Sequence, residues 1–452
     1  MKRIFLIGIG LLFCSLTFSQ DITGSWNGTL DLGASTLRIV FHIEEKDGVY
    51  TTTMDSPDQG ARGIKTTNTT LKKKNLTVNI ARLMATFEGK VKKNSIEGTF
   101  TQRGTSFPLV LTRGTIDPTR PQDPKPPYPY NSEDVYFENK QADIALAGTF
   151  TYPKEGNNFP VAVLITGSGR QNRDEELMNH RPFLVLADYL TRQGIAVLRY
   201  DDRGVGESKG VYHTATIQDF ATDALAAVAY LKTRQEINPR QIGLIGHSEG
   251  GSISFIASAD NQDIAFIVSM AGVAIKGDSL MKLQRNAMLP KMGSSKKDIE
   301  KNEELIRLVE TLIEKHSADS VYNYPDMFVE DIIPANMKKD KAARNSYKGA
   351  LLSLASPEIY SFNVYDPIED FQRIQCPVFA INGEKDLQVS ADANLQSFER
   401  WLPGKVTTKR YPGLNHLFQH AQTGLVDEYS RIEETISEEV LEDIVRWIKS
   451  VL

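Results

Sequence analysis

The sequence predicts a mostly parallel α/β domain preceded by a small all-β domain, and hydrophobic patterning supplies the main reasons. Over residues 133–452, short apolar runs alternate with amphipathic helical stretches. This alternation is typical of a doubly wound parallel sheet that helices cover on both faces. Over residues 21–113, apolar and polar residues alternate in short runs between turn signals, which favours an antiparallel sheet curled into a small barrel or sandwich. Residues 114–132 are rich in proline and are predicted to form an extended linker.

The elements of the α/β domain follow one another in a regular order. Apolar runs predict strands at residues 133–139, 147–153, 159–167, 195–202, 241–246, 265–272, 376–383 and 406–413. Amphipathic stretches predict helices at residues 181–194, 216–234, from 250, from about 391, and over 437–452. Between about residues 273 and 360 the strand pattern gives way to charged helical sequence. We interpret this stretch as a helical cap that interrupts one sheet.

The N-terminus has the layout of a secretory signal peptide over residues 1–20. Lys2 and Arg3 precede the apolar run Ile4–Phe18, and polar residues follow. The run is shorter than the ~20 residues that span a bilayer, so we expect export to the periplasm or the medium, without stable membrane insertion after cleavage. Lipid attachment at Cys14 is disfavoured, because the preceding Leu-Leu-Phe lacks the small residue that normally stands there.

Length, charge and cysteine content narrow the class of protein. The 452 residues are enough for two or three domains of roughly 100 to 200 residues each. The formal net charge is −5 and no basic stripe occurs, so nucleic acid is not an expected partner. After removal of a signal peptide Cys376 would be the single cysteine, so no disulfide is expected. The sequence assigns no oligomeric state.

The stretch Gly246-His247-Ser248-Glu249-Gly250 predicts a nucleophile. It follows an apolar strand and opens a helical pattern, which is the context of a nucleophile elbow. A sharp strand-to-helix turn would hold Ser248 exposed in a strained conformation, and the glycines two residues away on each side would let the backbone pass closely. A serine hydroxyl in this position still needs a base and donors for the oxyanion that it creates.

His416 is the predicted base. The chain has seven histidines, and His416 directly follows the last predicted strand and precedes the last helix, where a loop can reach the nucleophile. His420 is the alternative. His247 adjoins the nucleophile, and its side chain is expected to be directed elsewhere.

Asp386 is the predicted acid that orients the base. It lies in the loop that follows the strand at residues 376–383, where its carboxylate would accept a hydrogen bond from the imidazole and fix its tautomer. Glu384 is more consistent with a solvated loop charge, and Asp366 with a cap or brace of the returning segment.

Backbone N–H groups are the predicted oxyanion donors. One is the N–H of Glu249, directly after the nucleophile, and the other is that of Ser168 in the glycine-containing loop after the third strand, with Gly167 as the alternative. Arg170 and Arg173 in this loop either meet an anionic group of the substrate or form salt bridges at the surface.

The loop Asp201–Ser208 is interpreted as structural. It reads Asp-x-Arg-Gly-x-Gly-x-Ser, and its glycines allow it to turn beneath the site while Arg203 braces it.

Together these motifs resemble the α/β-hydrolase superfamily, and in particular bacterial carboxylesterases with an extra N-terminal β domain, on the serine aminopeptidase-like branch. The resemblance covers residues 133–452 and implies the α/β-hydrolase fold with Ser248, Asp386 and His416 as triad, in the chain order that this fold uses. It implies an oxyanion hole from Ser168 and Glu249, and ester hydrolysis without metal or cofactor. The oxyanion loop departs from the common His-Gly form by having Thr-Gly.

The leading hypothesis is therefore a serine carboxylesterase acting on a small-molecule ester. A serine peptidase of the aminopeptidase or prolyl type, using acidic cap residues, is the first alternative. The N-terminal module of about 90 residues is too short for the propeller that gates prolyl-type relatives. A binding protein on an inactive hydrolase scaffold is the third hypothesis, and the intact predicted triad argues against it.

Overall fold

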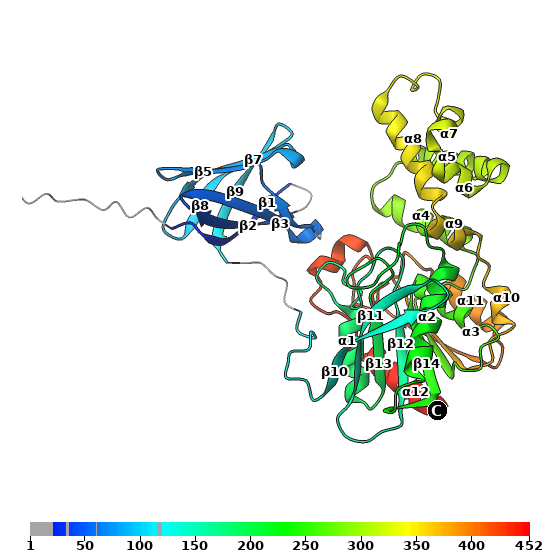
Figure 1. Ribbon diagram of the computed structural model, residues 1–452. Helices are drawn as coiled ribbons and strands as arrows, with labels where there is room; N and C mark the ends of the chain where they lie inside the picture. The colour runs from blue at the N-terminus through cyan, green and yellow to red at the C-terminus, as the bar shows by residue number, and fades with distance from the viewer. Residues whose placement is uncertain (1–20, 33–35, 60, 115–119) are drawn as a thin grey trace, which may run out of the picture. The chain divides into compact units, whose positions relative to one another are not determined.

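The computed structural model describes residues 21–32, 36–59, 61–114 and 120–452. The chain divides into two compact units, Met1–Asp117 and Pro118–Leu452 (Figure 1), and each is described by itself. The predicted signal peptide and Cys14 lie outside the described residues. In the part that is described, no helix is long and apolar enough to cross a membrane.

The first unit is one antiparallel sheet in the order β4-β3-β2-β1-β9-β8-β7-β6-β5. Its strands are β1 Gly24–Asp31, β2 Thr36–Lys46, β3 Val49–Ser56, β4 Ala61–Lys65, β5 Asn68–Lys72, β6 Asn75–Ile80, β7 Ala85–Val91, β8 Ser95–Gln102 and β9 Thr105–Arg113. The sheet curls, because Thr66 N donates to Thr52 O at 3.3 Å and Thr69 Oγ1 donates to Thr52 Oγ1 at 2.8 Å. These bonds bring β5 against β3, and the curled sheet encloses a core that includes Trp26 and Phe87.

The second unit contains an eight-stranded sheet in the order β10-β11-β13-β12-β14-β15-β16-β17. Its strands are β10 Tyr130–Asn139, β11 Ile144–Pro153, β12 Phe159–Ile165, β13 Ala196–Tyr200, β14 Ile237–His247, β15 Phe266–Met270, β16 Val378–Gly383 and β17 Val406–Tyr411. Strand β11 pairs antiparallel with both of its neighbours, β10 and β13. The pairs from β13 through β12, β14, β15 and β16 to β17 are all parallel. The predicted mostly parallel sheet is confirmed.

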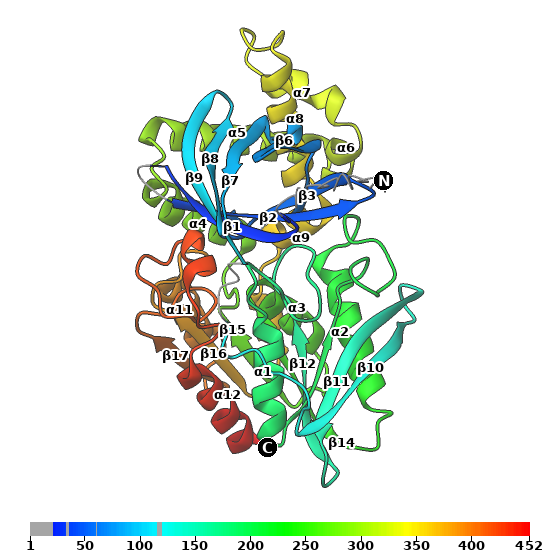
Figure 2. The ribbon, with the colours of Figure 1, turned by 90° about the vertical axis from the view of Figure 1, so that its left-hand side faces the viewer.

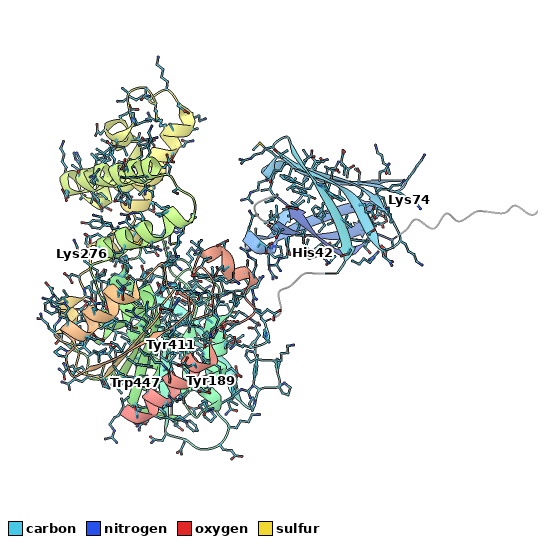
Figure 3. The ribbon with its side chains drawn as sticks, turned by 180° about the vertical axis from the view of Figure 1, so that it is seen from behind. His42, Lys74, Tyr189, Lys276, Tyr411 and Trp447 are labelled. Carbon is cyan, nitrogen blue, oxygen red and sulfur yellow. The ribbon has the colours of Figure 1, made fainter. Side chains whose placement is uncertain are left out.

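Helices cover both faces of this sheet, as the alternating pattern predicted. One face carries α1 Pro182–Arg192 and α12 Glu438–Val451, which lie side by side in Figure 2. Trp447 of α12, labelled in Figure 3, stacks on Phe379 of β16 with ring centroids 5.3 Å apart. The other face carries α2 Ile217–Leu231, α3 Glu249–Ser258 and α11 Ala391–Trp401.

The predicted cap lies between β15 and β16 and is helical throughout. Its helices are α4 Gly277–Lys291, α5 Lys296–His316, α6 Ala318–Asn323, α7 Pro325–Ile332, α8 Lys341–Leu354 and α9 Pro357–Val364, and the short α10 Ile368–Phe371 leads back to the sheet. Helices α5 to α8 enclose their own apolar core, which includes Val309, Val329 and Leu351. Helix α9 extends beyond residue 360 and packs against α2 of the sheet layer.

The predicted linker contains a segment that is packed on the second unit. Arg120 donates hydrogen bonds to the carbonyls of Met178, Asn179, Ser430 and Ile432. Further along, Gln122 contacts the backbone of residues 435–436, and Asp123 pairs with Arg181. Strand β10 then begins at Tyr130. The second unit therefore starts earlier than the residue 133 expected from proline content, because polar side chains between the prolines bind it.

Candidate active site

Ser248 occupies a sharp turn between β14 and α3. The strand ends at His247 and the helix begins at Glu249. Ser248 itself has φ 55° and ψ −120°, a backbone conformation that costs a non-glycine residue roughly 1–3 kcal/mol. Its N–H donates to Met270 O of the neighbouring strand at 2.9 Å. The sequence pattern predicted a strained serine at a strand-to-helix turn, and the geometry agrees.

Both glycines of the motif are required by close backbone contacts. A Cβ added at Gly246 would lie 2.1 Å from the carbonyl oxygen of Gly250, and one at Gly250 would lie 2.2 Å from that of Ile165. The elbow therefore packs directly on its own first helical turn and on the end of β12. Any side chain at either position would force these backbones apart.

His416 and Asp386 are paired in the loops that follow β17 and β16. Nδ1 of His416 lies 2.7 Å from Oδ2 of Asp386, and both side chains are buried. An N–H at Nδ1 would donate to the carboxylate and leave the lone pair of Nε2 free to accept a proton.

The base loop lies against the elbow. Nε2 of His247 is 3.0 Å from the carbonyl oxygen of His416, and the centroids of the two imidazole rings are 4.7 Å apart. The residue that precedes the proposed nucleophile thus contacts the backbone of the proposed base. This contact brings His416 to the elbow from 169 residues away in the chain.

The alternative residues have other partners. His420 is exposed and pairs with Glu434 at 2.8 Å. Glu384 accepts the N–H of Gly413 at 3.0 Å, and Asp366 accepts the N–H of Ile368 at 3.1 Å. The structure pairs Asp386, and neither alternative acid, with a histidine of the site.

The oxyanion loop after β12 approaches Ser248. A Cβ added at Gly167 would lie 3.3 Å from Cβ of Ser248. The N–H of Gly167 is occupied, because it donates to Oε1 of Glu175 at 2.7 Å. Within the described residues, the N–H groups of Ser168 and Glu249 have no acceptor. These are the two predicted donors, and the alternative donor Gly167 is committed elsewhere in this conformation.

The arginines near this loop have structural partners. Arg173 contacts the carboxylates of Asp134, Asp201 and Glu207 at 2.7–3.1 Å. Arg170 donates to the carbonyl of Gly204 at 2.7 Å. Of the two roles expected for these arginines, salt bridging is the one that the geometry of Arg173 supports.

Arg203 braces the loop Asp201–Ser208 as expected. Its guanidinium donates to both carboxylate oxygens of Asp223 on α2, at 2.7 and 2.9 Å. In the same loop Asp202 accepts hydrogen bonds from Thr166 Oγ1 and from Gln171 N, at 2.7 and 2.8 Å. Burial raises the pKa of Asp202 to about 8. The loop Asp201–Ser208 thus holds both ends of the oxyanion loop.

Four residues that contact the site were not assigned to it from the sequence. Glu175 bonds Gly167 N and His247, while Glu358 of the cap bonds Gly169 N and Tyr212. The pair of His247 and Glu175 has a signal in the sequence, because the histidine lies inside the elbow motif and the glutamate follows a glycine-containing loop. The pair of Tyr212 and Glu358 has no such signal, because nothing in their spacing along the chain indicates that they meet.

No group of three or more potential metal ligands among His, Cys, Asp and Glu occurs in the portion described.

The strained serine lies at the end of β14, and a buried Asp and a buried His lie in the loops after β16 and β17. This placement of the three residues is characteristic of the α/β-hydrolase fold. The family model described as "Serine aminopeptidase, S33" matches residues 181–330, which include the elbow. The second unit has the α/β-hydrolase fold.

Known proteins similar to this chain include an esterase. Esterase EstD of Thermotoga maritima is 26% identical over 316 residues, which cover 69% of this chain and 68% of EstD. Among solved structures, the α/β hydrolase GrgF from Penicillium sp. sh18 is 18% identical with a TM-score of 0.45, and the match covers 71% of this chain and 98% of GrgF. The esterase Pf2001 of Pyrococcus furiosus is 16% identical with a TM-score of 0.41, covering 71% and 93%.

Proposed function

We propose that this α/β-hydrolase is a serine carboxylesterase that cleaves small-molecule esters through an acyl-enzyme intermediate. The observation that carries the proposal is the buried pair of His416 and Asp386, 2.7 Å apart, held against the elbow that presents Ser248. The similarity to an esterase over more than two thirds of the chain supports the choice of ester as substrate.

In the acylation step, Ser248 Oγ attacks the ester carbonyl while Nε2 of His416 takes the hydroxyl proton. Asp386 accepts from Nδ1–H and stabilises the imidazolium that forms. The carbonyl oxygen becomes an oxyanion, which accepts hydrogen bonds from the N–H groups of Ser168 and Glu249. The carbon–oxygen bond to the alcohol then breaks, and His416 returns its proton to the leaving alkoxide.

In the deacylation step, a water molecule takes the place of the alcohol. His416 removes a proton from this water as it attacks the acyl carbon, and the oxyanion forms again in the same hole. Collapse of the intermediate breaks the bond to Ser248 Oγ, which recovers its proton from His416. The products are a carboxylic acid and an alcohol, and the enzyme is unchanged.

A substrate panel tests the esterase. Purified protein should hydrolyse p-nitrophenyl acetate or butyrate, and a fluorophosphonate probe should label the wild type but not Ser248→Ala. A folded wild type that takes no label and cleaves no ester would favour a binding protein on an inactive scaffold. Esters of varied acyl length and sugar esters would then define the acyl and alcohol groups.

A serine aminopeptidase is the second candidate, and two observations favour it. The matching family model carries that description, and a cap carboxylate, Glu358, stands at the oxyanion loop. Cleavage of aminoacyl or prolyl p-nitroanilides, with no turnover of p-nitrophenyl esters, would replace the esterase with the peptidase.

We also propose that residues 1–20 direct export, since their charge and apolar pattern is that of a signal peptide. Expression of the full chain in a bacterial host, followed by fractionation and N-terminal sequencing, tests this. The expected result is a periplasmic or secreted protein that begins near Asp21. An intact N-terminus in the cytoplasm would contradict it.

A further inference from the structure

The oxyanion loop has three consecutive N–H groups with different partners. Gly167 N donates to Oε1 of Glu175 at 2.7 Å, and Gly169 N donates to Oε1 of Glu358 at 3.0 Å. The N–H of Ser168, between them, has no acceptor in the residues that the structure covers. The loop is therefore tied on both sides of the one N–H of this loop that the proposed mechanism assigns to the oxyanion.

Glu175 is held in place by a buried histidine. Oε1 of Glu175 lies 2.9 Å from Nδ1 of His247, and both side chains are buried. The other nitrogen of His247 faces the carbonyl oxygen of His416 at 3.0 Å. Since both ring nitrogens face acceptors, only the doubly protonated imidazolium donates to both. The charge of the imidazolium balances that of Glu175 beside the oxyanion loop.

Glu358 is held by a tyrosine of the catalytic unit. The hydroxyl of Tyr212 donates to Oε1 of Glu358 at 2.6 Å, the same oxygen that accepts Gly169 N. Glu358 lies in the first turn of α9, the cap helix that packs against α2 (Figure 1). A hydrogen bond joins these two helices, from Ile217 N to Oγ of Ser361 at 3.1 Å. The cap thus reaches the oxyanion loop through one side chain.

A glycine-containing loop needs such support if it is to stabilise charge. Oxyanion donors contribute to rate only when they already point to the place where the charge develops. Gly169 has φ +86°, and glycines allow the peptide groups beside them to rotate at little cost. Two fixed acceptors on the flanking N–H groups oppose that rotation and keep the N–H of Ser168 in place.

We propose that Glu175 and Glu358 are positioning residues that clamp the oxyanion loop, so that a residue of the cap completes the oxyanion hole. The proposal rests on the esterase function proposed above. Glu358 acts through the loop and not on the substrate. Its effect is therefore on the rate of the chemical step and not on substrate binding.

Variants of Glu358 test the clamp best, because this residue is half-buried while Glu175 has a buried charged partner whose loss threatens folding. Glu358→Ala removes the acceptor, and Glu358→Gln keeps an acceptor oxygen without the charge. Tyr212→Phe removes only the anchoring hydroxyl. Glu384→Gln is the matched control, because Glu384 also accepts a glycine N–H, that of Gly413 at 3.0 Å, away from the oxyanion loop.

We expect Glu358→Ala to lower kcat on p-nitrophenyl butyrate by about 10-fold or more, below the 10²–10³ typical of deleting an oxyanion donor itself. KM should change little. Affinity for a trifluoromethyl ketone, whose adduct with Ser248 carries an oxyanion, should fall by the same factor as kcat. Tyr212→Phe should also lower kcat, but by a smaller factor. Glu358→Gln should retain most of kcat, and Glu384→Gln should have the kcat of the wild type.

Hydrogen exchange gives a measurement that does not depend on turnover. Amides of the peptide that covers residues 166–170 should exchange faster in Glu358→Ala than in the wild type and in Glu384→Gln. Unchanged exchange overturns the clamp even if no ester is cleaved. A change in KM alone, or equal losses of kcat in Glu358→Ala and Glu384→Gln, overturns it as well. Failure of the esterase function is separate, because it shows as absent labelling and turnover in the wild type.

Discussion

The neighbours of Asp386 decide which of its oxygens meets the imidazole. Oδ1 accepts the N–H groups of Gln388 and Val389, both at 2.8 Å. Oδ2 is left to face His416, with Asn382 Nδ2 at 3.3 Å as its other contact. The carboxylate therefore has one oxygen fixed by the loop and one directed to the base.

Asp386→Asn should lower kcat by about 10²–10⁴ with the fold intact, because an amide stabilises the imidazolium less and disturbs the tautomer of His416. Steady-state kinetics on p-nitrophenyl esters and a thermal melt measure the two effects. Glu384→Gln, which changes the nearby loop carboxylate, should retain wild-type kcat. The reverse result would identify Glu384 as the acid.

The buried pair of His247 and Glu175 gives the protein a pH dependence of stability. The titratable groups that face His247 are Glu175, Asp386 and His416. Burial lowers the pKa of His247, but the charge and hydrogen bond of Glu175, the hydrogen bond to the His416 carbonyl and the charge of Asp386 together outweigh burial. The pKa is therefore raised above its ordinary value of 6.5. Folding therefore favours the protonated ring.

His247→Gln tests this dependence. The stability that protonation of His247 contributes is fully present below the unfolded-state pKa of about 6.5 and is lost as pH rises through the folded-state pKa. The difference in unfolding free energy between wild type and variant should thus be larger at about pH 6 than at about pH 9. Urea titrations at both values measure it, and a difference that grows with pH would contradict a charged His247.

At the scale of elements, the elbow depends on contact between backbones at the end of β12 and the start of α3. Gly250→Ala should destabilise the protein by about 3 kcal/mol or more, since its Cβ would overlap the carbonyl of Ile165. Activity should fall with it. Gly349→Ala is the control: Gly349 is exposed on helix α8 with nothing near its added Cβ, and alanine there should stabilise by ~0.5–1 kcal/mol. Chemical unfolding compares the two, and equal effects would refute the steric account.

The elements themselves could be predicted well because their signals are local. Strands β12, β15 and β16 are short, mostly apolar runs that end at or near a glycine, and α2 begins at a capping box between Thr216 and Asp219. The elbow serine could be predicted because its motif and its strand-to-helix context are contiguous. His416 and Asp386 followed from their positions after the last two strands.

The clamp residues could not be predicted in the same way. Glu358 meets Gly169 across 189 residues, and its position depends on how the cap helices return to α2. Helical periodicity shows which face of a helix is apolar, but not which loop the end of that helix contacts. Tyr212 carries no motif at all. His247 was expected to point elsewhere, and its partner Glu175 becomes visible only when the oxyanion loop is folded over the elbow.

At the scale of the whole molecule, every residue of the proposed chemistry belongs to the second unit. Ser248, Asp386 and His416, together with Ser168 and Glu249, lie within Pro118–Leu452. That unit also includes Arg120, whose guanidinium bonds backbone carbonyls from two loops. The proline-rich stretch predicted as linker is thus partly a component of the catalytic unit.

Two truncations separate these roles. A protein of residues 118–452 should keep kcat on small p-nitrophenyl esters within about 3-fold of the full chain, because it retains the whole site and a core of its own. A protein of residues 125–452 should melt at a lower temperature than the protein of residues 118–452, because it lacks Arg120, Gln122 and Asp123. Loss of activity in the longer protein would show that the N-terminal unit takes part in catalysis. Equal melting temperatures of the two proteins would show that residues 118–124 do not stabilise the second unit.

The cap has a core of its own and enters and leaves the sheet between the adjacent strands β15 and β16. Evolution can therefore replace the cap or change its size, since the residues of the cap core can change without repacking the sheet. The bond from Glu358 to the oxyanion loop limits that freedom at one point. A grafted cap that brings a new entrance for substrate must also bring an acceptor for Gly169, or the hybrid enzyme will bind esters that it turns over slowly.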